Sequence, residues 1–131
     1  MEMALYAVNL VNKILVYSGA NHPLYIVRQG ELIELVPDTQ PISIYRVENP
    51  FTIRKFVLKE DDVIYTFTDG FIDQFGGADY IKFGKARFKE LLLSIHALPL
   101  YEQKIKIEQT FVNWKGNTRQ IDDVLVVGIK I

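Results

Sequence analysis

Short apolar runs separated by turn residues fill the first half of the chain. Runs of about four to eight apolar, β-branched and aromatic residues are typical of β-strands. On this pattern the sequence predicts strands over residues 4–10, 14–18, 24–28, 31–36, 51–58 and 63–68. The first four follow one another at hairpin spacing and predict an antiparallel meander. The proline-containing stretch 37–50 is predicted to be a long irregular connection.

The period of the apolar positions changes after Gly76-Gly77. The spacing i, i+3, i+4 and i+7 marks one face of a helix, and it is shown by Phe88, Leu91, Leu92 and Ile95. The elements predicted for this half are helices over residues 85–98 and 100–115 and a final strand over residues 124–131. Pro99 suits the break between the helices, and Gly116 suits the end of the second. The predicted fold class is therefore α+β, with a mainly antiparallel sheet.

Composition and charge are those of an ordinary globular domain. The 131 residues suffice for one domain with a buried core, and 49% hydrophobic with 24% charged residues is a globular balance. Lys+Arg number 15 and Asp+Glu 16, so the net charge of −1 gives no indication of a nucleic-acid or anionic-membrane partner. The absence of Cys excludes disulfides, thiolate catalysis and Cys-based metal sites. No apolar run reaches the roughly 20 residues of a membrane span and no signal peptide is apparent, so a cytoplasmic location is expected.

The stretch that carries the most chemistry runs from residue 63 to 77, VIYTFTDGFIDQFGG. Its largely buried predicted strand ends in Asp69-Gly70, and Gly70 is expected to give a sharp exit through a positive φ. Asp69 would then be fixed at the rim of the sheet, where a carboxylate is a good ligand for a hard cation. Turn chemistry alone favours the simpler interpretation of an ordinary Asp-Gly turn.

A second acidic pair, Asp122-Asp123, precedes the predicted final strand and favours the metal-site interpretation. If that strand and the strand ending at Asp69 are antiparallel neighbours, Asp69 and Asp122 converge on one rim. Converging carboxylates with water completing the ligand shell suit Mg²⁺ or Mn²⁺ rather than Zn²⁺. Asp73, four residues beyond Asp69, would join them or orient a bound water. Alternation along a strand is expected to point Asp123 away from Asp122.

Other polar residues are weaker candidates. His22 lies in a predicted turn, where Asn-His-Pro is also ordinary turn chemistry, and His96 is expected to be a partly exposed helix residue. Asp61-Asp62 most simply form a solvated turn before a strand. Trp114 and the phenylalanines of the helices are expected in the core. No hydroxyl side chain has a visible base partner, so a nucleophilic triad lacks support.

Several short motifs occur together in an order and spacing that are specific, although each alone is not. They are YSGANHPL (residues 17–24), QPI (40–42), YTFTDG (65–70), DQFGG (73–77), WKG (114–116) and DDVLV (122–126). Through them, residues 4–131 resemble the C-terminal part of a metal-dependent Ser/Thr protein phosphatase of the PPM (protein phosphatase 2C-like) family, in its SpoIIE-like bacterial branch. The DQFGG and WKG forms resemble the variant common in Bacteroidetes signalling proteins.

The resemblance implies an αββα sandwich, of which this chain would be the C-terminal half, and a site for Mn²⁺ or Mg²⁺. Asp69 matches the aspartate of the family's Asp-Gly motif and Asp122 the aspartate before the last strand, both ligands of the metal pair. Asp73 matches a position that supports a further metal or its waters in some members. Gly70 and Asp123 are candidates for backbone or outer contacts to the metals. The implied reaction is attack on a phosphoserine or phosphothreonine of a protein by a metal-bridging water. The resemblance gives an anti-sigma-factor antagonist as a candidate for that protein.

The chain departs from the family pattern in two places. Asn21 replaces the usual Gly of the Gly-His-Pro-like motif, so His22 is given no role. The first-half motif Asp-x-x-Gly-His-Gly, whose Asp bridges both metals, does not occur in residues 1–131. We therefore expect a partial phosphatase domain that contains no catalytic residue and is inactive alone. The alternatives are a non-catalytic half-domain serving as a protein-interaction module and, more remotely, an unrelated metal-binding β domain.

The predicted strands are apolar at consecutive positions, which is typical of strands covered on both faces. The two predicted helices cover one sheet face, and in the family the opposite cover comes from the first half of the domain. An exposed apolar face usually marks an interface. We therefore expect a homo-oligomer, most simply a dimer formed face to face or along a strand edge. The alternative is that long surface side chains and the 37–54 loop fold over the gap.

Overall fold

The computed structural model describes residues 1–43 and 49–131, so the connection predicted over residues 37–50 lies partly outside the described residues. The described residues form two compact units, Met1–Thr66 with Ile129–Ile131, and Phe67–Gly128. The strands are β1 Met3–Asn9, β2 Ile14–Ala20, β3 Leu24–Arg28, β4 Glu31–Leu35, β5 Arg54–Val57, β6 Val63–Phe67, β7 Phe75–Gly76, β8 Ile81–Lys82 and β9 Val126–Lys130. The helices are α1 Gly70–Asp73, α2 Lys85–Ile95 and α3 Leu100–Lys115. No helix among the described residues is long and apolar enough to cross a membrane.

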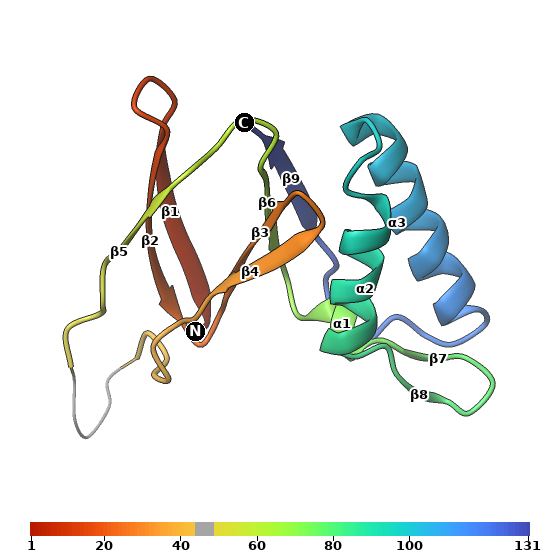
Figure 1. Ribbon diagram of the computed structural model, residues 1–131. Coiled ribbons are helices and arrows are strands. Elements are labelled where there is room, and N and C mark those ends of the chain that lie inside the picture. Colours follow the sequence, from red (N-terminus) through yellow and green to blue (C-terminus); the bar gives the residue numbers. More distant parts are fainter. Residues whose placement is uncertain (44–48) are drawn as a thin grey trace. The chain divides into compact units, whose positions relative to one another are not determined.

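The first unit contains two antiparallel hairpins that belong to different sheets (Figure 1). One sheet has the order β1-β2-β5, and the other has the order β4-β3-β6-β9. The predicted four-stranded meander is therefore wrong, because β2 pairs with β1 and β5 and not with β3. The chain changes sheet at the connection between β2 and β3, where Asn21 has a φ of 53° and Pro23 lacks an N–H for a sheet hydrogen bond. The Tyr17 hydroxyl fixes this turn by donating to the His22 carbonyl at 2.6 Å.

The two sheets of the first unit pack face to face around one hydrophobic core. Leu15 and Tyr17 of β2 lie in the same buried cluster as Leu24 and Ile26 of β3 and Ile64 of β6. Burial alternates along β1, as expected for a strand with one face on a core. The opposite face of the β1-β2-β5 sheet carries exposed apolar side chains, which include Met3, Leu5 and Val57.

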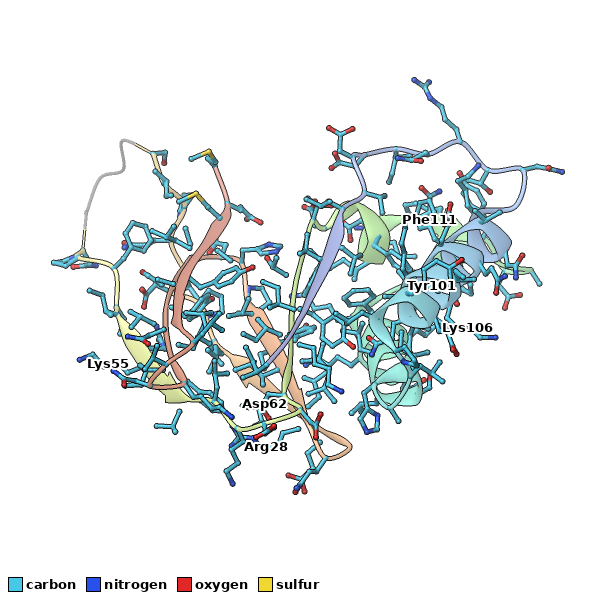
Figure 2. All side chains as sticks on the ribbon, turned by 90° about the horizontal axis from the view of Figure 1, so that it is seen from above. Arg28, Lys55, Asp62, Tyr101, Lys106 and Phe111 are labelled. Atoms are coloured by element: carbon cyan, nitrogen blue, oxygen red, sulfur yellow. The ribbon has the colours of Figure 1, made fainter. Side chains whose placement is uncertain are left out.

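The Asp61-Asp62 turn of the first unit differs from the prediction. Asp61 is exposed and pairs with Lys130 at 2.9 Å, as expected for a solvated turn. Asp62, however, is fully buried and accepts hydrogen bonds from Arg28 Nε at 2.9 Å and Arg28 Nη2 at 2.7 Å (Figure 2). A third hydrogen bond comes from the Lys59 amide at 2.8 Å. Burial alone raises the pKa of Asp62, but these hydrogen bonds and the Arg28 charge outweigh it and hold the pKa below its usual value.

The second unit contains the helices and the short β7–β8 hairpin (Figure 1). The prediction of α3 over residues 100–115 is confirmed, and α2 ends at Ile95 rather than at residue 98. Gly116 ends α3 with a φ of 51°, and its N–H donates to Val112 at 2.9 Å. Phe71 of α1 lies at the centre of an aromatic cluster, with ring centroids 5.0 Å from Phe88 and 5.1 Å from Phe111. Phe88 is fully buried, whereas Phe111 and Trp114 are only partly buried, so the expectation that all of them are core is correct only in part.

Candidate metal centre

The segment that carries Asp122 lies against the end of β6, as the sequence predicts. Strands β6 and β9 are neighbours in their sheet. Beyond β6, the Thr68 amide donates to the Leu125 carbonyl at 2.9 Å. The Thr68 hydroxyl donates to the Asp123 carbonyl at 2.8 Å and accepts from the Leu125 amide at 2.9 Å. Thr68 therefore fixes the Asp122-Asp123 segment beside Asp69.

Gly70 has a different role from the predicted one. It does not take the positive φ of a sharp turn but is the first residue of α1. A Cβ at this position would overlap the Asp123 carbonyl oxygen, so only glycine allows the backbone of α1 to approach this segment so closely. Gly70 thus permits contact between the two acid-bearing segments, and its conformational freedom is not what the site requires.

The carboxylates of the candidate site differ in their surroundings. Asp69 is exposed and immediately precedes α1, and its carbonyl accepts from the Asp73 amide at 2.9 Å. Asp73 ends α1, and its carboxylate lies 3.1 Å from Lys82 Nζ. Asp122 is exposed, and its Oδ1 accepts from the Asp123 amide at 2.7 Å. Because β9 begins only at Val126, the alternation argument for Asp123 does not apply.

The donor set fits a hard divalent cation in kind, because all the candidate donors are carboxylate or carbonyl oxygens. It is incomplete in number. Within residues 1–43 and 49–131, no three His, Cys, Asp or Glu side chains lie close enough together to hold a metal ion. Asp69 and Asp122 are thus brought onto neighbouring segments, while the Asp73 carboxylate is engaged by Lys82.

The two histidines lie outside the acid-bearing segments. His96 follows α2, is partly exposed as predicted, and its Nδ1 lies 2.6 Å from the Leu93 carbonyl oxygen. His22 belongs to the turn that Tyr17 fixes in the first unit. Burial raises the pKa of Tyr17 to about 12, so its hydroxyl remains a donor at neutral pH.

A group of contacts around Gln74 was not predicted as part of the site. The fully buried Gln74 side chain donates from Nε2 to the Arg119 carbonyl at 3.1 Å. Trp114 Nε1 donates to the Gln74 carbonyl at 3.0 Å. A Cβ on Gly76 would overlap the Trp114 carbonyl, so glycine is required there. The co-occurrence of the DQFGG and WKG motifs was the signal for this contact, although their pairing in space is not visible in the pattern.

The chain has the fold of protein phosphatase 2C domains. It is similar to the SiaA-PP2C domain of Pseudomonas aeruginosa, with 27% identity and a TM-score of 0.91, over 99% of this chain and 51% of that chain. It is also similar to the RsbU and RsbW domains of Rv1364c from Mycobacterium tuberculosis, with 22% identity and a TM-score of 0.76, over 98% of this chain and 35% of that chain. The SpoIIE phosphatase domain of Bacillus subtilis matches with 14% identity and a TM-score of 0.71, over 99% of this chain and 56% of that chain. No curated protein matches the chain significantly.

A match to a family model shows which family the chain belongs to. The family model for Stage II sporulation protein E (SpoIIE) matches residues 1–131, and the chain belongs to this family. The α+β class with antiparallel sheets, two consecutive helices and a final strand is thereby confirmed. The chain spans about half the length of the phosphatase structure with 27% identity.

Proposed function

We propose that this chain is part of a metal-dependent protein Ser/Thr phosphatase domain of bacterial signalling. The observation that carries the proposal is the placement of Asp69 beside the Asp122 segment in a chain that matches the SpoIIE family throughout. The substrate class is a phosphoserine- or phosphothreonine-containing protein, and an anti-sigma-factor antagonist is the member of that class we favour.

In this proposal Asp69 and Asp122 bind Mn²⁺ or Mg²⁺ through their carboxylates. A bound metal pair would lower the pKa of a water and offset charge on the phosphoryl oxygens. Thr68 and Gly70 keep the two acid-bearing segments together, through the hydroxyl contacts of Thr68 and the close approach at Gly70. Asp73 has an accessory role, because Lys82 competes with a metal for its carboxylate.

The competing proposal is a non-catalytic interaction module. Two structural observations and one from the sequence favour it. The described residues do not assemble a complete ligand set, and the outer face of the β1-β2-β5 sheet is apolar and exposed. Residues 1–131 also lack the Asp-x-x-Gly-His-Gly motif.

In the phosphatase proposal, the same observations mean that the metal site is completed by groups that this chain does not contain.

Residual metal binding tests the proposal. With two carboxylates available, we expect a Mn²⁺ dissociation constant on the order of 10⁻⁴ to 10⁻³ M, as for loosely preorganised oxygen sites. Calorimetric titration should show that Asp69→Asn abolishes this binding. Asp79→Asn is the matched control, because Asp79 is an exposed acid of the second unit outside the site. Micromolar binding, or binding that is indifferent to Asp69→Asn, would contradict the assignment of Asp69.

A further inference from the structure

Gln74 connects several parts of the second unit through hydrogen bonds of its side chain and its carbonyl. It follows α1 directly, and its side chain is fully buried. Its Nε2 donates to the Phe75 carbonyl at 2.9 Å and to the Arg119 carbonyl at 3.1 Å. Its own carbonyl accepts from Trp114 Nε1 at 3.0 Å and from the Phe83 amide at 2.9 Å. Gln74 thus ties the end of α1 to β7, to α3 and to the segment beyond α3.

The segment beyond α3, residues 116–125, carries Asp122 and contains no helix or strand. Its C-terminal side is held by the hydrogen bonds of Thr68 to Asp123 and Leu125. Its middle is held by Gln74 at Arg119, three residues before Asp122. The start of the segment is held at the end of α3, where the Thr118 amide donates to the Lys115 carbonyl at 2.9 Å. The Gln74 contact adds an anchor between Thr118 and Asp122, which joins this part of the segment to the end of α1. An irregular segment with fewer anchors keeps conformational freedom that a preorganised metal ligand must lose.

The chemistry of the Gln74 side chain separates this role from simple core filling. Its Oε1 is buried and has no hydrogen-bond partner among the described residues, which is unfavourable for an amide. An apolar side chain of similar size would remove that unpaired acceptor. The same replacement would also remove both hydrogen bonds that Gln74 Nε2 donates. The one to the Arg119 carbonyl joins residues that are 45 positions apart in the sequence.

We infer that Gln74 is a positioning residue, which holds the Arg119–Asp123 part of the chain so that Asp122 stays beside Asp69. The inference rests on the proposed metal site for its functional meaning. Gln74 does not touch the metal or the substrate in this role, and it acts through the Arg119 carbonyl alone.

A matched pair of variants tests the inference. Gln103 is also buried, and its Nε2 donates to the carbonyls of His96 at 3.2 Å and Leu98 at 2.8 Å, away from the acid-bearing segments. Gln74→Leu and Gln103→Leu therefore remove the same kind of amide bridge from the same unit. Two readouts are compared: the rate of tryptic cleavage after the exposed Arg119 under native conditions, and the affinity for Mn²⁺.

For Gln74→Leu we expect cleavage after Arg119 to accelerate roughly tenfold relative to cleavage after the other Lys and Arg residues. The held carbonyl belongs to the scissile bond, so its release exposes that bond selectively. Mn²⁺ affinity should fall roughly tenfold, the lower end of the loss seen when groups that orient metal ligands are removed. Gln103→Leu should leave both values within about twofold of the wild-type chain, since it is not joined to either acid-bearing segment.

Each outcome decides the inference. Unchanged selective cleavage in Gln74→Leu would overturn it, and so would faster cleavage with unchanged Mn²⁺ affinity. If the wild-type chain binds no Mn²⁺, the proposed metal site fails, and the anchoring of the segment is judged by cleavage alone. If circular dichroism shows that Gln74→Leu does not fold, Gln74→Met and Gln103→Met, with unbranched side chains, replace the pair.

Discussion

The buried ion pair between Arg28 and Asp62 should be the most sensitive single contact in the first unit. Asp62 is fully buried, and two of its three hydrogen bonds come from Arg28. The Arg28 side chain is 19% exposed, donates also to the Val57 carbonyl at 2.8 Å, and lies over the Phe56 ring. Arg28→Met would remove the Arg28 contacts and leave a buried carboxylate that keeps the Lys59 amide but has lost its guanidinium partner.

The expected loss follows from the burial of the group left behind. Removing one partner of a buried ion pair typically costs about 3–5 kcal/mol, and we expect about 3–4 kcal/mol for Arg28→Met at pH 7. Asp62→Asn should cost less, about 2 kcal/mol, because the partly exposed Arg28 can reach water. The double variant Arg28→Met/Asp62→Asn should be more stable than Arg28→Met alone, since it contains no stranded charge.

The pH dependence has a definite sign. In the wild-type chain the pKa of Asp62 is lower when folded than when unfolded. The pair therefore contributes its full share of the free energy of unfolding at pH values above the unfolded-state pKa of about 4. This contribution is lost as the pH falls through the lower pKa of the folded state. In Arg28→Met the Lys59 amide still donates to Asp62, but the contributions of Arg28 that offset burial are gone, so we expect burial to raise the pKa of Asp62. The difference in free energy of unfolding between the wild-type chain and Arg28→Met should therefore become smaller as the pH falls from 7 to 4.

Urea unfolding monitored by circular dichroism measures these differences. Lys130→Met is the matched control, because it breaks the pair with the adjacent but exposed Asp61 and should change stability very little. If Arg28→Met lowers the free energy of unfolding by less than about 1 kcal/mol, the pair contributes no more than an ordinary surface pair. That result would refute the claim that the substitution leaves a costly buried charge. A loss independent of pH would show that lost packing, and not a stranded charge, is responsible.

Three further predictions concern the site and the surface. The chain alone should not hydrolyse a phosphopeptide in the presence of Mn²⁺, because a two-metal reaction needs both ions fixed; turnover that Asp122→Asn abolishes would show this to be wrong. Gly70→Ala should lower the free energy of unfolding by about 1–3 kcal/mol, because the added Cβ meets the Asp123 carbonyl; unchanged urea stability would contradict the close approach. Light scattering should show a dimer that Leu5→Lys weakens, because Leu5 is 62% exposed on the outer sheet face; a monodisperse monomer that binds no hydrophobic dye would rule the dimer out.

The elements that sequence predicts well are those whose cause is local. The bounds of α3 follow from its apolar spacing between Pro99 and Gly116, and the structure has the same bounds. Strand β3 likewise has the predicted residues. In these cases backbone preference and side-chain period lie within the element itself, so the pattern contains the information.

Pairing and burial depend on distant partners and are predicted less well. The meander fails because the choice between continuing one sheet and entering another is made at Asn21 and Pro23, in a turn that is compatible with either. Asp62 and Asp61 have identical side chains and adjacent positions, yet only Asp62 lies beside Arg28. No periodicity distinguishes the buried carboxylate from the exposed one, because the difference comes from a residue 34 positions away.

The candidate site shows the same division between local and distant causes. That Asp69 and the Asp122 segment lie side by side can be predicted from sequence, because strand ends that are neighbours in a sheet bring their flanking residues together. The groups that hold these acids near one another cannot, since Thr68, Gly70 and Gln74 resemble ordinary strand-end, turn and loop residues. Each acts on a backbone carbonyl of the segment after α3: a hydroxyl hydrogen bond and a missing Cβ at Asp123, and an amide hydrogen bond at Arg119. Metal affinity in this chain should therefore respond to uncharged residues that could never be ligands, and that dependence distinguishes a preorganised site from two acids that lie near each other by chance.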